Sequence, residues 1–110
     1  MTKSSINILR IDSSARGGGS ETRALNDAFI SRIGAAADTT VIHRDLAADL
    51  PDFVNETWVG AAFTDPNARS DTQVAALVAS DAFVAELEAA DVIVIGAPIY
   101  SFSIPAVLKA

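Results

Sequence analysis

The sequence INILRIDSSARGGGSET at residues 6–22 decides the fold of this 110-residue chain. Residues 6–11 are rich in isoleucine and leucine and predict a strand. A loop of hydroxyl and glycine residues follows directly. Beyond it, spacings of three and four place Leu25, Ala28, Phe29, Arg32 and Ile33 on one face, which predicts an amphipathic helix from Ser20 to about Ala36. A strand, a glycine-rich loop and a helix in this order are typical of an α/β protein.

Two further segments supply strands. Residues 91–97 (DVIVIGA) hold an unbroken apolar row, which predicts a parallel strand buried on both faces. Residues 39–43 (TTVIH) are β-branched but have charged neighbours, so a weaker strand at a sheet edge is expected. Together with the helices, these strands give the order β-α-β-α-β.

The second helix is predicted over residues 71–90. Ser70 and Gln73 have the capping-box spacing that satisfies two backbone donors at a helix start. Phe83 points away from the main apolar face of this helix, so both sides of the helix have apolar side chains. The sequence leaves two interpretations: the long loop at residues 47–69 covers the Phe83 side, or a second subunit does. The main apolar face holds Val74, Leu77, Val78 and Val84.

Composition excludes several classes of function. The net charge is −6 and only 8 residues are Lys or Arg, so no basic patch for nucleic acid or an anionic membrane surface is expected. No apolar run approaches the roughly 20 residues that span a bilayer. The chain has no cysteine and one histidine, which removes the usual metal ligands and fits a reducing compartment. We therefore expect a cytoplasmic protein without a metal.

The loop after the first strand has the features of a phosphate site. Hydroxyls of Ser14, Ser20 and Thr22, with first-turn backbone N–H groups that include Glu21, surround a helix N-terminus, where the dipole favours an anion. Thr22 stands where the dinucleotide fingerprint requires glycine, and no Gly-Lys-Ser/Thr motif is present. A flavin phosphate is the better candidate. The alternative to a phosphate site is a capped helix after a flexible turn. Arg16 either reaches the phosphate or extends into solvent.

A second cluster follows the third strand at residues 96–102. In open α/β sheets, ligands bind at the carboxyl ends of the strands. The site lies where the connections from two neighbouring strands lead in opposite directions along the sheet. With the flavodoxin-like strand order, this loop and the phosphate loop flank one crevice. Tyr100 and Phe102 offer flat apolar surface for a ring, or else belong to the core. His43 is expected to be structural or exposed, and Trp58 to serve in packing or at the lip of a pocket.

These residues resemble the N-terminal half of the FMN-dependent NADH-azoreductases, within the flavodoxin-like NAD(P)H quinone oxidoreductases. The resemblance rests on residues 9–14 and 20–22, on Arg-Asp-Leu-Ala at 44–47 and on residues 80–100. Its most specific part is the pattern Pro-x-Tyr-x-Phe-x-Ile, formed by Pro98, Tyr100, Phe102 and Ile104.

The resemblance implies a fold, a cofactor and a reaction. The fold is a flavodoxin-like parallel sheet with helices on both faces, ending after its third strand, so that residues 1–110 form the N-terminal half of an FMN-binding domain. The protein would be a homodimer in which NADH reduces FMN and the flavin then reduces a quinone or azo compound in a ping-pong cycle. The residues implied in FMN binding are Ser14, Ser20, Glu21, Thr22, Ile99, Tyr100, Ser101 and Phe102. No catalytic side chain is implied in this half, because the flavin carries the chemistry.

Two other functions compete with this one. The first is a catalytically incomplete fragment that self-associates through its third strand and the Phe83 face. The second is a one-electron carrier of the flavodoxin type. The loop at residues 12–22 lacks the Thr-Gly-x-Thr pattern typical of such carriers, which favours the oxidoreductase.

Overall fold

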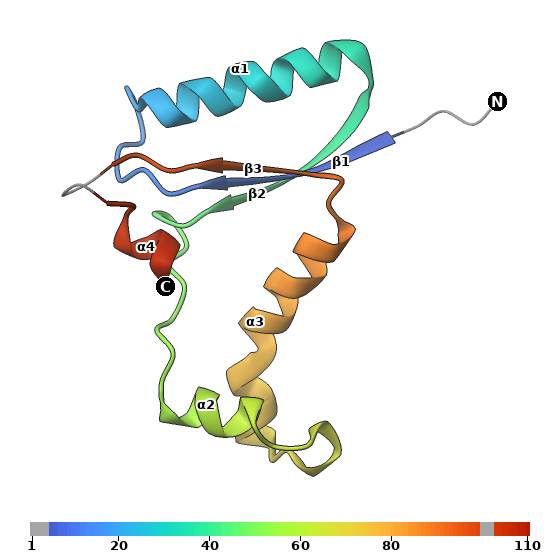
Figure 1. The fold of residues 1–110 in the computed structure, drawn as a ribbon, viewed down its shortest axis with the longest axis vertical. Helices are drawn as coiled ribbons and strands as arrows, with labels where there is room; N and C mark the ends of the chain where they lie inside the picture. Colours follow the sequence, from blue (N-terminus) through green and yellow to red (C-terminus); the bar gives the residue numbers. More distant parts are fainter. Residues whose placement is uncertain (1–4, 100–102) are drawn as a thin grey trace.

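The computed structural model describes residues 5–99 and 103–110 of the chain. Three strands and three longer helices follow one another with two short helical segments (Figure 1). The elements are β1 (Ser5–Asp12), α1 (Glu21–Ala36), β2 (Asp38–Asp45), α2 (Glu56–Ala62), a 3-10 turn (Pro66–Ala68), α3 (Asp71–Ala89), β3 (Val92–Gly96) and α4 (Ala106–Lys109).

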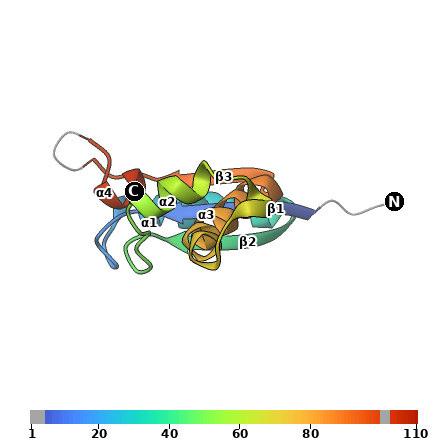
Figure 2. The same ribbon diagram turned by 90° about the horizontal axis from the view of Figure 1, so that it is seen from below.

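The strands form one parallel sheet in the order β2-β1-β3, and Figure 2 shows its face from the side of α3, with β1 between β3 and β2. Asp12, the last residue of β1, is in register with Asp45 of β2 and Gly96 of β3. All three strands therefore end at the same edge of the sheet. The predicted element order and the edge position of the second strand are confirmed.

The two long helices begin at the predicted caps. Ser20 caps α1 by accepting a hydrogen bond from the backbone N–H of Arg23. At the start of α3, Ser70 Oγ accepts from Gln73 N at 3.2 Å, and Gln73 Oε1 accepts from Ser70 N at 3.0 Å. This is the complete capping box that the spacing predicts.

β3 is not buried on both faces, and that part of the prediction is wrong. Ile93 and Ile95 are 45% and 51% exposed. In register they lie beside Leu9 and Ile11 of β1, on the face of the sheet that α3 approaches. In the described part of the chain, the C-terminal end of α3 lies beside Leu9 of β1 and Ile42 of β2, whereas Ile93 and Ile95 of β3 stay exposed.

The buried face of α1 also differs from the predicted apolar face. Leu25 and Phe29 are 67% and 47% exposed, whereas Asn26 is the buried residue of this helix. Hydrophobic spacing alone does not determine which side of α1 is buried. Polar contacts made by Arg23 and Asn26 instead set which side of α1 meets the sheet.

α3 leaves the sheet steeply and carries α2 at its far end (Figure 1). We call α2 and α3 together the arm. The radius of gyration is 16.8 Å, against about 13 Å for a compact domain of this length. The molecule is consequently flat and open, with extents of 47 × 47 × 19 Å.

Two sets of contacts hold the arm together and to the sheet. Trp58 of α2 donates through Nε1 to Ser80 Oγ of α3 at 2.9 Å, so it packs α2 against α3, and it also lines a surface pocket beside Ser80. Arg44 of β2 makes a two-pronged ion pair with Glu86 and lies 4.8 Å from the ring centre of Phe83. The arm is therefore tied to the sheet at its C-terminal end.

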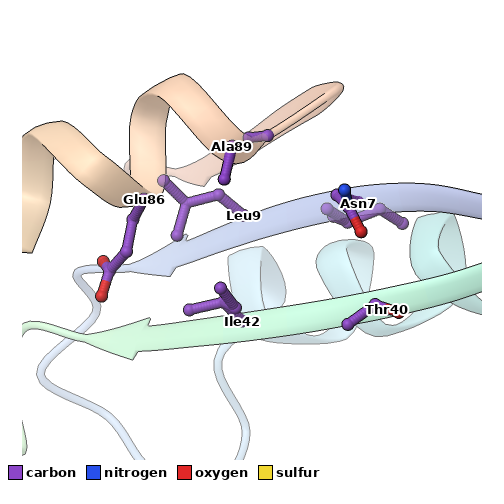
Figure 3. Close-up of a pocket in the computed structure, with 8 residues that line it drawn as sticks. Asn7, Leu9, Thr40, Ile42, Glu86 and Ala89 are labelled. Atoms are coloured by element: carbon purple, nitrogen blue, oxygen red, sulfur yellow. The ribbon is translucent and has the colours of Figure 1, made fainter.

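A small apolar hollow of about 150 Å³ remains at that junction. Figure 3 shows Leu9 and Ile42 from neighbouring strands on the face beneath Ala89 of α3. Ile8 and Leu9 of β1 are nearly fully buried and form the centre of the core. In the described part of the chain, no helix is long and apolar enough to cross a membrane.

Candidate functional site

The loop between β1 and α1 lies at the carboxyl edge of the sheet. Its first residues, Ser13 and Ser14, and its last, Ser20, are all at most 8% exposed, whereas the residues between them are open to solvent. Ser13 Oγ donates to the carbonyl oxygen of Gly96 at 2.6 Å, which ties the loop to the end of β3. The loop is thus anchored at both ends and exposed in its middle.

The first turn of α1 presents backbone donors beside two hydroxyl groups. The first intrahelical bond runs from Ala24 N to Ser20 O, and Ser20 Oγ caps Arg23 N. The N–H groups of Glu21 and Thr22 therefore have no acceptor within the helix. Ser20 Oγ and Thr22 Oγ1 lie 3.2 Å apart. The three predicted residues of this turn form one cluster.

Gly19 gives the loop its tight approach to α1. It has a φ of +73°, a left-handed conformation that glycine adopts without strain. A Cβ at Gly19 would lie 3.2 Å from Arg16 Nη2, so the guanidinium of Arg16 lies over this turn. A Cβ at Gly17 or Gly18 would meet nothing within 4 Å, so the outer loop is open.

A buried carboxylate supports the loop from below. Asp12 is fully buried, and its oxygens accept from Arg10 Nε at 2.7 Å and Asn26 Nδ2 at 2.9 Å and lie 2.6 Å from His43 Nε2. Burial by itself would raise the pKa of Asp12, but the hydrogen bonds from Arg10, Asn26 and His43 outweigh it and lower the pKa. Asp12 is therefore a charged, fully paired residue at neutral pH.

Arg23 forms a second polar link. Its guanidinium makes a bidentate pair with Asp45 at 2.8 and 2.9 Å, and it donates to the carbonyl oxygens of Ser14 and Arg16. The hydrogen bond from Arg23 lowers the pKa of Asp45 to about 2, against a smaller effect of burial. β2, α1 and the loop are thus joined through one arginine.

The second predicted cluster meets the first at Gly96. A Cβ there would lie 2.8 Å from Asn26 Nδ2 and 3.3 Å from Thr22 Cβ, so only glycine lets β3 end against α1. Ile99, three residues on, is 77% exposed. Tyr100, Ser101 and Phe102 lie outside the described residues. The start of the second loop therefore lies beside the first turn of α1, where the loop from β1 ends.

The sequence did not single out Asp12 and Asn26 as parts of one network. The signal available was position: an aspartate at the carboxyl end of a buried strand, and an asparagine one turn into the helix that follows. His43 is partly exposed at 45% of its side chain, and its contact with Asp12 gives it the structural role expected. Its register opposite Arg10 explains how it reaches Asp12, two residues further along β1.

This arrangement can bind an oxyanion. Its hydroxyls, the two first-turn N–H groups that have no acceptor within the helix and the cation of Arg16 match what a phosphate requires. In residues 5–99 and 103–110, every buried side-chain nitrogen and oxygen has a hydrogen-bond partner. No group of three or more His, Asp or Glu side chains within those residues could hold a metal ion. A ligand would therefore bind to the solvent-exposed side of the loop, formed by residues 15–19.

Comparison with known proteins agrees with this geometry. Residues 6–110 match the family described by the flavodoxin-like fold. The chain is 49% identical over 104 residues to an FMN-dependent NADH:quinone oxidoreductase of Thiobacillus denitrificans, covering 94% of this chain and 50% of that protein. It is 46% identical to an FMN-dependent NADH:quinone oxidoreductase of Colwellia psychrerythraea, covering 96% and 54%.

The chain thus spans about half the length of the curated relatives it matches. An azoreductase from Bacillus anthracis has a similar structure, with a TM-score of 0.82 at 22% identity, over 94% of this chain and 52% of that one. At that identity the likeness speaks for the fold. It places the three-stranded sheet and its helices in a known arrangement.

Proposed function

Since the chain belongs to the family with the flavodoxin-like fold, we propose that it forms the phosphate-binding half of an FMN-dependent NADH oxidoreductase. The observation that carries the proposal is the loop between β1 and α1. There, Ser20 and Thr22 place two hydroxyls 3.2 Å apart beside the unused N–H groups of a helix N-terminus. Residues 1–110 are then the N-terminal half of the FMN-binding domain.

We assign the cofactor contacts residue by residue. Ser14, Ser20, Glu21 and Thr22 bind the phosphate through hydroxyl and backbone N–H groups, and the helix dipole favours the anion. We assign the contacts with the flavin ring to Ile99, which is 77% exposed, and to Tyr100, Ser101 and Phe102, which lie outside the described residues. When bound, FMN supplies the hydride chemistry in a ping-pong cycle, with NADH as donor and a quinone or azo compound as acceptor. The polar network beneath the loop keeps it in place.

The relatives named for NADH:quinone oxidoreduction support this assignment, because their similarity covers almost the whole chain. The fully assembled enzyme is proposed to be a homodimer in the cytoplasm. Exposed apolar residues on α3 and β3 support the dimer, since side chains such as Val78 at 60% and Ile95 at 51% exposure gain from being covered. The measurement for the dimer is sedimentation of the chain over a range of concentrations, and a monomer at every concentration would contradict it.

Titration of the chain with FMN, followed by flavin fluorescence, tests the proposal. Saturable binding is expected, with riboflavin weaker by about tenfold or more because it lacks the phosphate. Thr22→Val should weaken FMN binding about threefold to tenfold by removing one hydroxyl donor. Thr72→Val is the matched control, since Thr72 holds the same second position in α3. Absence of binding, or equal affinity for FMN and riboflavin, would refute the phosphate site.

The self-associating fragment is the second candidate, and the open face of β3 favours it. Ile93 and Ile95 lie at the sheet edge with about half of each side chain exposed. Such an edge is a template for pairing with another chain. Association without FMN binding in the same two experiments would favour this candidate over the oxidoreductase.

A further inference from the structure

Arg23 lies beneath the phosphate loop, and its contacts differ from those of a ligand-binding cation. Its side chain is 14% exposed. Nη2 donates to the carbonyl oxygen of Ser14 at 2.7 Å, and Nε donates to that of Arg16 at 2.9 Å. One guanidinium therefore holds two loop carbonyls that are two residues apart.

The guanidinium is itself held from the opposite side. Asp45 at the end of β2 pairs with Nη1 at 2.8 Å and Nη2 at 2.9 Å, and the same carboxylate accepts from the backbone N–H groups of Ala47 and Ala48. Asp12 lies 3.9 Å from Nη1. Among the described residues, at least four of the five N–H donors of Arg23 are thus committed to protein acceptors.

These contacts fix the direction of the loop peptides. In a trans peptide the carbonyl and the following N–H point in opposite directions. Because the carbonyls of Ser14 and Arg16 point toward Arg23, the N–H groups of Ala15 and Gly17 point away from it. Gly17 is exposed with open space around it, so its N–H is directed out of the buried network.

We propose that Arg23, clamped by Asp45, is a positioning residue that orients the loop peptides toward a phosphate without touching that phosphate itself. The inference rests on the proposed function for the identity of the ligand, the phosphate of FMN. It also separates two roles among the nearby cations. Arg16 lies over the loop and is the one placed to meet an anion, whereas Arg23 lies beneath it.

The test compares Arg23→Lys with Arg32→Lys, a substitution at an exposed residue of the same helix. Lysine keeps the charge but lacks the fork that bridges two carbonyls and a carboxylate. Arg23→Lys is expected to weaken FMN binding about tenfold while changing riboflavin binding by less than about twofold. Equal weakening of both flavins would show general loosening of the fold and overturn the proposal, as would unchanged FMN binding.

Asp45→Asn distinguishes positioning from direct contact, and it serves equally where Arg23→Lys fails to fold. If Arg23 contacted the phosphate, loss of a competing negative charge would strengthen FMN binding. The positioning role predicts the reverse, a weakening of about threefold, because the guanidinium is no longer held. Stronger FMN binding by Asp45→Asn would overturn the proposal.

Amide hydrogen exchange tests the inference apart from the ligand. At equal global stability, Arg23→Lys should speed exchange in the peptide covering residues 14–20 by about tenfold, and Arg32→Lys should leave it unchanged. Unchanged exchange in Arg23→Lys would overturn the positioning role. If the unsubstituted chain binds no FMN, the proposed function fails, and this exchange measurement still decides whether Arg23 orders the loop.

Discussion

The loop side of the sheet and the arm are stabilised in different ways. Beneath the loop, Asp12 is fully buried and accepts from several donors, and Gly96 leaves room for no side chain. On the arm, Val74 is 52% exposed and Val78 is 60% exposed. The loop is held by buried directional polar contacts, whereas the arm keeps much of its apolar surface in contact with water.

This difference has a physical consequence. Buried hydrogen bonds have a strict geometry, so a polar network fixes positions to within a few tenths of an ångström, as a phosphate site requires. Apolar contacts are less directional and tolerate change better. Substitutions beneath the loop should therefore cost stability and FMN affinity together, and comparable substitutions on the arm should not.

The largest effect is expected from Asp12→Ala. It removes the acceptor shared by Arg10, Asn26 and His43, and leaving such donors unpaired in the interior costs about 3 kcal/mol of unfolding free energy. Urea unfolding measures the change. Asp81→Ala on the exposed side of α3 is the control and should stay within about 0.5 kcal/mol. Similar losses in both variants would remove the contrast between loop and arm.

Gly96→Ala should follow, with a loss of about 1–3 kcal/mol from overpacking. The added Cβ would lie 2.8 Å from Asn26 Nδ2 and 3.2 Å from Asp12 Oδ1, so the network must shift. Gly60→Ala is the matched change on the arm. Its Cβ would meet nothing closer than Gln73 Nε2 at 4.0 Å, and alanine favours the helix by up to about 1 kcal/mol. The midpoint of thermal unfolding should therefore fall in Gly96→Ala and rise in Gly60→Ala. A higher midpoint in Gly96→Ala would contradict the close packing at this position.

Asp45→Asn gives a smaller, pH-dependent effect. The folded pKa of about 2 lies below the usual 3.8, so the charged carboxylate stabilises the fold above about pH 4 and this contribution disappears as the pH falls toward 2. Asp45 is 28% exposed, and we expect a loss on the order of 1–2 kcal/mol at pH 7. The urea midpoints of the unsubstituted chain and of Asp45→Asn, measured at pH 7, 4 and 3, should converge as the pH falls. A difference that grows as the pH falls would contradict this prediction.

The sequence predicted the elements of both regions because their signals are local. The capping pairs at Ser20 and Ser70, and the apolar rows of β1 and β3, lie within a few residues of the features they specify. The strand order followed from these elements and general topology. Those signals therefore suffice for the outline of the fold and for the place of the loop between β1 and α1.

What the sequence did not predict depends on contacts between distant segments. Asn26 is buried against Asp12, 14 residues away, and His43 reaches it across 31 residues. Hydrophobic periodicity points Leu25 of α1 toward the core, but the polar network turns that side chain outward. Similarly, the apolar residues of β3 predict full burial of Ile93, but its exposure depends on which strands α3 contacts, and α3 lies beside Leu9 of β1 and Ile42 of β2.

The smallest expected effect gives the sharpest form of the comparison, because Ser20 and Ser70 are the same residue at the same position of two helices. Ser20 caps α1 and Ser70 caps α3. Replacing either by alanine should cost about 1 kcal/mol of stability. FMN affinity should fall about tenfold only in Ser20→Ala, where a hydroxyl beside Thr22 Oγ1 is lost at the phosphate site. Urea unfolding and flavin titration of the two variants provide the measurement. Equal FMN affinity in both would mean that Ser20 is a helix cap alone, whereas a loss confined to Ser20→Ala would separate the binding role of this hydroxyl from its structural one.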